Sequence, residues 1–411
     1  MTARANGKGV RLTWPWVRFL SAHLVTSTGD QIATLVIALL AFQLTGSPMA
    51  VAIAFGLGYL GSVVGFLMVP ALTGRSPRGV LVATDIVAAL LVLTLLPVWM
   101  PLAAVSLFFL GALRAINRPY SQAMIARLAV SDPGRAKLSA DYQTALTISL
   151  GFGLAAGALL VSLDVPQVGL ALNALSFAGA AWLNSGLPVK IETQSQMVIS
   201  HAAKRWSGLA GSEMRRQLRD PILSSLLLWQ LLVFGPLIAY NSQLVSLAAA
   251  VSSSGLAYVA IEAASILGIV SAALIVRRGR FVSSEAQRWL YPIYIVASTC
   301  IGLGYSAGAV AESVAIIGLF LAIAGAADSV SEIFQLRLMH QKTDDQTREN
   351  VYALRFVLGG TSRTVAAFAL GYVAEAWGIR PALFGTGVLM AIFSGGLWFF
   401  GRFERPAGVA V

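Results

Sequence analysis

The sequence is poor in charge: Asp, Glu, Lys and Arg together make up 11% of its 411 residues. Soluble domains average roughly 25% charged residues. Hydrophobic residues account for 57% of the chain, and the mean hydropathy is +0.76. Long apolar runs in such a composition are typical of a protein that crosses a membrane many times.

The residues of several catalytic and metal sites are also missing. The one cysteine, Cys300, lies in an apolar run and excludes a disulfide within the chain and a thiolate metal site. No G-x-x-x-x-G-K-[ST] or H-E-x-x-H motif occurs. None of the three histidines is plausibly paired with a serine nucleophile. We therefore expect no enzyme activity, no cofactor and no bound metal.

Apolar segments about 20 residues long, the length of a membrane-spanning helix, recur along the chain. Turn sequences such as "TGSP" at 45–48 and "SPRG" at 76–79 separate them. They lack the alternation of barrel strands. The predicted fold is an all-α integral membrane protein of twelve helices, at 17–42, 49–70, 80–98, 102–126, 138–161, 166–188, 222–248, 255–276, 287–308, 313–339, 350–373 and 381–402.

The lysines and arginines predict the orientation of these spans, because cytoplasmic loops hold them in excess. With the N-terminus inside, the inner loops and tails hold 24 of the 29, and the outer loops hold only Arg380. The first span carries His23 and Asp30 and no clear cleavage site, so we interpret it as retained rather than as a signal peptide. We expect a multi-pass protein of the cell (inner) membrane with both termini cytoplasmic. The net charge of +11 then reflects topology, and no basic module for nucleic acid is present.

A polar stretch at 189–220 divides the spans into six and six. It is either an interfacial amphipathic helix or a solvated linker. The expected domains are therefore an N-terminal half (1–188), this linker, and a C-terminal half (221–411). A shift of 210 residues places Arg127 on Arg337 and Tyr142 on Tyr352, which suggests parallel repeats.

Two segments carry a resemblance to a known family: "STGDQIATLVIALLAFQLTGSPMAVAIAFGLGYL" at 27–60 and "LRAINRPYSQAMIARLAVSDPGRAKLSADYQTAL" at 113–146. They contain a "GD" ending at Asp30, a "QLTGSP" turn, and Arg114 five residues before Pro119. The chain resembles major facilitator transporters of the bacterial drug and siderophore exporter type, which include enterobactin and macrolide exporters. The resemblance implies two six-helix halves and a central cavity lined by spans one, four, seven and ten.

The chain departs from the family pattern in two places. In the loop between spans two and three, Arg75 and Arg78 match, but Gly74 replaces the acidic residue that helps latch the halves together. In span five the antiporter pattern G-P-x-x-G-G reads "GLAAGA" at 153–158, with Leu154 in place of proline. We expect Arg75, Arg78 and Asp85, which lie in or near this loop, to take part in gating.

Several charged residues lie inside predicted spans. A charge at mid-bilayer costs roughly 3 kcal/mol on insertion scales and therefore faces a cavity or a partner. These residues are Asp30, Arg114, Arg118, Glu262, Asp328, Glu332, Arg355 and Arg363. All of them except Arg355 are candidates for substrate or proton binding. In the structural alternative, the arginines and acids pair with one another and hold helices together.

We expect a secondary active transporter that exports an amphiphilic small molecule, a drug-like compound or a siderophore, by proton antiport through Asp30. Its partners would be this substrate, protons and the lipid bilayer. A monomer is the starting assumption, and the sequence leaves the oligomeric state open. Two alternatives remain: an importer or facilitator of a small anionic or zwitterionic solute, and a non-transporting membrane sensor or scaffold.

Overall fold

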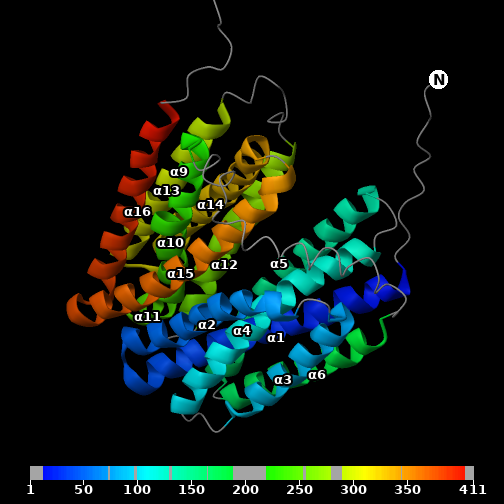
Figure 1. Cartoon of the computed structure of the whole chain (residues 1–411). Helices are drawn as coiled ribbons and strands as arrows, with labels where there is room; N and C mark the ends of the chain where they lie inside the picture. The colour runs from blue at the N-terminus through cyan, green and yellow to red at the C-terminus, as the bar shows by residue number, and fades with distance from the viewer. Residues whose placement is uncertain are drawn as a thin grey trace, which may run out of the picture.

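The computed structural model describes residues 13–72, 75–96, 100–128, 132–163, 165–187, 219–252, 256–278, 289–343 and 345–402. Within these ranges the secondary structure is helical, and no strand occurs (Figure 1). The expected linker at 189–220 lies almost wholly outside the described residues, and so does Gly74.

The first group of helices comprises α1 (Trp14–Thr45), α2 (Pro48–Met68) with the short η1 (Val69–Leu72), α3 (Pro77–Leu93), α4 (Met100–Leu128), α5 (Asp132–Ser162) and α6 (Pro166–Ser185). The second comprises α9 (Pro221–Trp229), η4 (Gln230–Phe234), α10 (Gly235–Ser242), α11 (Leu244–Ala249), α12 (Leu256–Arg278), α13 (Leu290–Val310), α14 (Val314–Lys342), α15 (Asp345–Trp377) and α16 (Ile379–Arg402). Among the described residues, nine helices are long and apolar enough to cross a membrane. With α3, α4 and α6 packed among them, they form the expected twelve-helix arrangement, in which α9, η4 and α10 together make one rod.

The turn residues noted in the sequence end and begin these helices. Gly46 adopts φ +66° after α1, a left-handed conformation that favours glycine. The Ser47 hydroxyl then caps α2 by accepting from the Met49 and Ala50 N–H groups, and Pro48 occupies the first turn. Ser76 caps α3 in the same way, so the predicted turns at 45–48 and 76–79 are confirmed.

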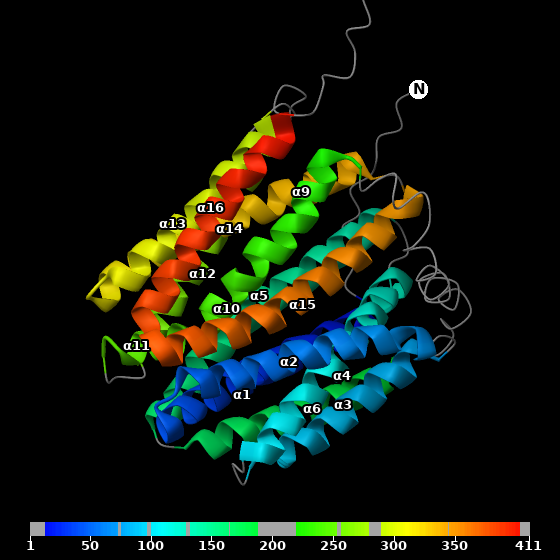
Figure 2. The same cartoon turned by 60° about the vertical axis from the view of Figure 1, so that its left-hand side comes forward.

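Helices α1 to α6 pack chiefly with one another, as do α9 to α16. Contacts between the two groups are made mainly by α2 with α15, and to a smaller extent by α5 with α12. The groups diverge toward the end where α1 begins and α16 ends, and they meet at the opposite end (Figures 1 and 2). We call that opposite end, where α1 ends and α2 begins, the far end.

A small set of hydrogen bonds ties the two groups together at the far end. The Glu375 carboxylate of α15 accepts from the Ser47 hydroxyl at 2.7 Å and from the Met49 N–H at 3.4 Å. The Gln243 side chain, between α10 and α11, donates to the Pro48 carbonyl at 2.9 Å. We call these contacts the far-end clasp.

Glycines allow the closest helix contacts within each group. A Cβ added at Gly111 of α4 would lie 2.0 Å from the Gly58 carbonyl oxygen of α2. In the second group, a Cβ at Gly268 of α12 would lie 2.0 Å from the Ala322 carbonyl oxygen of α14. Small residues permit such backbone approach inside a membrane. The pair Gly268–Ala322 follows Gly58–Gly111 by about 210 residues, the same offset as the sequence similarities.

Two features of the helices differ from the expectation. Helices α4, α5 and α15 extend beyond the predicted spans, because polar turns of helix continue past the apolar core. The segment expected as one span at 222–248 is interrupted by the π-helix η4 just before Gly235 and Pro236. A wider turn next to a proline relieves its clash with the preceding turn and is often found at functional sites.

Candidate functional site

Arg114 and Arg118 of α4 lie on the side of the first group that faces the second. Arg114 contacts Asp30 of α1 at two points: its Nε donates to Oδ2 at 2.7 Å, and its Nη2 lies 2.7 Å from Oδ1. The Asp30 side chain is 16% exposed and that of Arg114 is 41% exposed. A two-point guanidinium–carboxylate contact is strong and directional. This pair is therefore ordered yet reachable.

The packing of α1 determines where Asp30 points. The preceding Gly29 is buried against α6, and a Cβ added there would lie 2.3 Å from the Ser176 hydroxyl. Successive residues of a helix are about 100° apart, so Asp30 turns away from α6 toward α4. The "GD" dipeptide thus combines a contact glycine with a carboxylate that faces Arg114.

Arg363 of α15 lies between aromatic rings of both groups. Its guanidinium is 5.4 Å from the ring centroid of Tyr59 on α2 and 5.7 Å from that of Phe234 in η4. Its Nε donates to the Gly359 carbonyl at 3.1 Å. Cation–π contacts of this kind stabilise a desolvated guanidinium without an acid. Tyr59 also lies near Arg114.

Arg118, one turn beyond Arg114, contacts the same interface. Its guanidinium is 5.8 Å from the ring centroid of Phe356 on α15, and Phe356 packs on Phe66 of α2 at 4.4 Å. Within the described part of the chain, neither Arg118 nor Arg363 forms an ion pair. Among the described residues, the interface therefore carries two arginines that contact aromatic faces and no acid.

The second group contains a polar cluster of its own. Arg355 of α15 donates to Glu332 of α14 at 3.0 Å and to Gln335 at 2.9 Å. Gln335 donates in turn to the Leu226 carbonyl at 3.2 Å. The Gln230 side-chain oxygen accepts from the Arg355 Nε at 2.9 Å, in the amide orientation that satisfies both of its ends. Arg355 is thus the partner of Glu332, as the structural alternative for Glu332 anticipated, and this acid belongs to a side-chain network between helices.

Two further acids, Asp328 of α14 and Glu262 of α12, lie near Tyr305 of α13. The Tyr305 hydroxyl donates to Asn241 at 2.6 Å, and its ring packs edge-on against Tyr240. Neither acid forms an ion pair within the described residues. The second group therefore contributes two carboxyl groups that have no ion-pair partner among the described residues.

The three residues expected to gate the protein make their contacts within the first group. Arg78 donates to the Leu187 carbonyl at 3.1 Å. Asp85 is buried and accepts from Asn184 of α6 at 2.9 Å. Arg75 is exposed, and its N–H donates to the Leu72 carbonyl. In the parts of the chain that the structure describes, the hydrogen bonds between the two groups at a helix end are those of the far-end clasp.

Several side chains of this interface were not expected from the sequence. Tyr59, Phe234 and Phe356 lie in apolar runs, where an aromatic residue looks like any core residue. Glu375 lies near the end of its helix, where acids are common. Only the contacts of each residue with another helix distinguish it.

The sequence profile of the Major Facilitator Superfamily matches residues 19–367. The crystal structure of the nucleoside transporter NupG superposes with a TM-score of 0.71 at 12% identity, covering 95% of this chain and 100% of that one. The crystal structure of a D-xylose–proton symporter superposes with a TM-score of 0.70 at 11% identity, covering 94% of this chain and 96% of that one. That of the human organic anion transporter MFSD10 superposes with a TM-score of 0.58 at 17% identity, covering 94% of this chain and 100% of that one. No curated protein matched in sequence. At such identities these structures share the fold alone.

Proposed function

The chain belongs to the major facilitator superfamily and is a membrane transporter, and we propose that it exports an amphiphilic small molecule, drug-like or a siderophore, in exchange for protons. The observation that carries the proposal is the two-point contact between Asp30 and Arg114. It supplies a carboxylate within the membrane that is paired but remains reachable from the interface between the helix groups.

The Asp30 carboxylate has three competing partners: the Arg114 guanidinium, a proton, and a basic group on a substrate. A protonated carboxyl no longer attracts either cation, so proton and substrate exclude each other. Alternating access, in which residues 1–188 rock against residues 221–411, would present the site to one side at a time. A carboxylate that holds a proton or a substrate, but not both, makes the transport an exchange.

The surroundings suit a molecule with an apolar body. Tyr59, Phe234 and Phe356 supply aromatic faces from both groups. Glu262 and Asp328 supply carboxyl groups that form no ion pair among the described residues. A basic or zwitterionic amphiphile would find partners for both of its parts in this interface.

The proposed orientation follows from the loop charges, which place both termini in the cytoplasm of a cell whose inner membrane holds the protein. The far-end clasp then lies outside, and the two groups diverge toward the cytoplasm. In this state the exporter would take its substrate from the cytoplasm.

A second function is favoured by the unpaired arginines. If the substrate is anionic, Arg118 and Arg363 attract it, and protonation of Asp30 releases Arg114 to join them. Proton and anion would then bind together, and the protein would be a proton-coupled importer of a small anionic solute.

The direction of proton movement distinguishes these functions. Proteoliposomes would contain a pH-sensitive dye and receive a panel of siderophores and amphiphilic drugs from outside. An exchanger makes the interior more alkaline as substrate enters, and a symporter makes it more acidic. Substrate entry without a pH change would indicate a facilitator, and a lack of entry for every compound would favour the sensor or scaffold. Loss of either signal in Asp30→Asn would identify the coupling carboxylate.

A further inference from the structure

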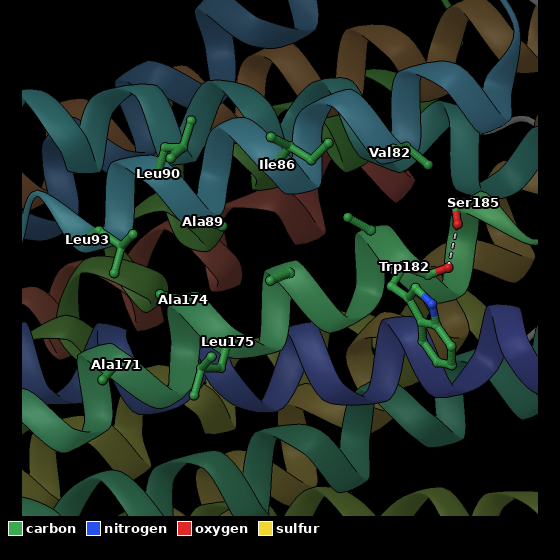
Figure 3. A pocket seen from close by; sticks show the side chains of 12 residues that line it. Val82, Ile86, Ala89, Leu90, Leu93, Ala171, Ala174, Leu175, Trp182 and Ser185 are labelled. Carbon is green, nitrogen blue, oxygen red and sulfur yellow. Dashed lines mark hydrogen bonds between the residues drawn. The ribbon is translucent and has the colours of Figure 1, made fainter.

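A groove runs between α3 and α6 on the outer face of the first helix group, away from the second group (Figures 1 and 3). Its volume is about 720 Å³, and apolar side chains line nearly all of it. Val82, Trp182 and Ser185 lie at one end, and Leu93 and Ala171 at the other (Figure 3).

The groove has the length of one lipid leaflet. From Val82 to Leu93 the helix rises about 16 Å at 1.5 Å per residue, and half of the hydrocarbon core of a bilayer measures about 15 Å. Leu90 and Leu175, on its two walls, are 59% and 67% exposed. An extended acyl chain fits this space lengthwise, whereas an extended protein segment would need backbone hydrogen-bond partners that the apolar walls do not offer.

Two arginines lie at the Trp182 end. The Arg18 guanidinium of α1 is 5.6 Å from the Trp182 ring centroid, and its Nη2 donates to the Trp182 carbonyl at 3.4 Å. Arg78 of α3, one turn before Val82, donates to the Leu187 carbonyl just after α6. Both arginines therefore converge on the last turn of α6, beside the end of the groove.

These contacts occupy only part of each guanidinium. An arginine has five N–H donors, and each of these two gives one to a carbonyl. The Arg18 Nε is buried and has no hydrogen-bond partner. Neither arginine forms an ion pair within the described residues. A phosphate group matches the remaining donors, because guanidinium binds phosphate through two parallel hydrogen bonds.

From this combination we propose that the α3/α6 groove binds one anionic glycerophospholipid, with an acyl chain along the groove and its phosphate at Arg18 and Arg78. The site faces the lipid and is separate from the interface that carries Asp30 and Arg114. It therefore does not depend on which substrate is transported.

Native mass spectrometry of the full chain in detergent tests the site. Phosphatidylglycerol and phosphatidylcholine with identical acyl chains would be added in equal amounts. We expect one retained phosphatidylglycerol per chain in the wild type. In the double variant Arg18→Gln/Arg78→Gln, the preference of the protein for phosphatidylglycerol over phosphatidylcholine should fall by about fivefold for each arginine removed. This factor is the equivalent of about 1 kcal/mol for a basic residue at a membrane surface.

Two further comparisons separate the groove from general lipid binding. Ala178→Phe fills the groove and should displace both lipids, whereas Ala155→Phe, at an exposed position on α5, should not. Arg337→Gln/Arg380→Gln removes the same charge elsewhere and should leave the preference intact. The proposal is overturned if the Arg18/Arg78 variant keeps the wild-type preference, if Ala178→Phe retains phosphatidylglycerol, or if the wild type is a dimer that Ala178→Phe dissociates.

Discussion

Arg114 of α4 contacts both carboxylate oxygens of Asp30 on α1, at 2.7 Å each, although the two residues are 84 positions apart in the chain. The contact joins a carboxylate and a guanidinium near the middle of α1 and α4. The family resemblance places both helices at the central cavity. The chemistry of the contact can be tested apart from its contribution to stability.

Asp30→Asn should abolish substrate-driven proton movement, because an amide cannot take up a proton at neutral pH. It also leaves Arg114 unpaired, which should lower the free energy of unfolding by about 1 kcal/mol, a modest value for a partly exposed pair. Asp30→Asn/Arg114→Gln should regain this stability without regaining coupling. Thermal unfolding in detergent and the vesicle pH assay give the two readouts. Full coupling in Asp30→Asn would refute the assignment of the proton site.

Glu375→Gln should loosen the far-end clasp, since the amide is a weaker acceptor than the carboxylate for the Ser47 hydroxyl and the Met49 N–H. We expect the population that is open at the far end to rise about fivefold, for a loss of about 1 kcal/mol. Spin labels at Leu44→Cys and Trp377→Cys, both exposed positions, would report the distance across that end in a Cys300→Ser background. Glu312→Gln, an exposed acid at the same end, is the matched control. Equal distance distributions in both variants would exclude the clasp.

Gly61→Ala should destabilise the first helix group, because the added Cβ would overlap the Phe108 carbonyl oxygen at 1.8 Å and push α2 away from α4. We expect a loss of about 2 kcal/mol or more, within the range of overpacked cores. Gly179→Ala, which has open space around it, should be neutral or slightly stabilising. Melting temperatures in detergent provide the comparison. A Gly61→Ala protein as stable as Gly179→Ala would show that α2 and α4 lie further apart than described.

Arg355→Gln should weaken the cluster that joins α14 and α15, because it leaves Glu332 and Gln335 without their shared donor. The expected cost is about 2 kcal/mol, since the arginine side chain is only 13% exposed. Arg355→Lys should retain part of it, because an ammonium group reaches one acceptor well but lacks the planar fork. Unfolding measurements should find the wild type most stable, Arg355→Lys less stable and Arg355→Gln least stable. If both variants unfold as the wild type does, the cluster contributes no stability.

Local sequence signals anticipated the helix ends well. Gly46, Ser47 and Pro48 end one helix and start the next through their own backbone and side-chain preferences. The interruption of the rod from Pro221 to Ser242 did not appear in the prediction, which had one span at 222–248. The π-helical turn before Gly235 depends on how α15 packs there, where the Ser362 hydroxyl donates to the Leu231 carbonyl.

The site was predictable as a set of charged residues but not as a set of pairs. A charge inside an apolar span stands out in any sequence, so Asp30, Arg114 and Arg363 were found. The sequence did not reveal that Arg355 rather than Arg363 pairs with Glu332, or that Arg363 rests on Tyr59 and Phe234.

The sequence by itself determined that this is a twelve-helix membrane protein with charges in its spans, because a lipid bilayer requires each crossing segment to be long, apolar and internally hydrogen-bonded. Only the tertiary structure decided which charges meet. Ser47 and Glu375 are 328 positions apart, and their contact depends on the packing of α2 against α15. The sequence does not distinguish one arginine or one acid from another as the partner of a given residue. A hydrogen bond weakens when its donor and acceptor move apart by a fraction of an ångström. The packing of the helices therefore determines which side chains pair.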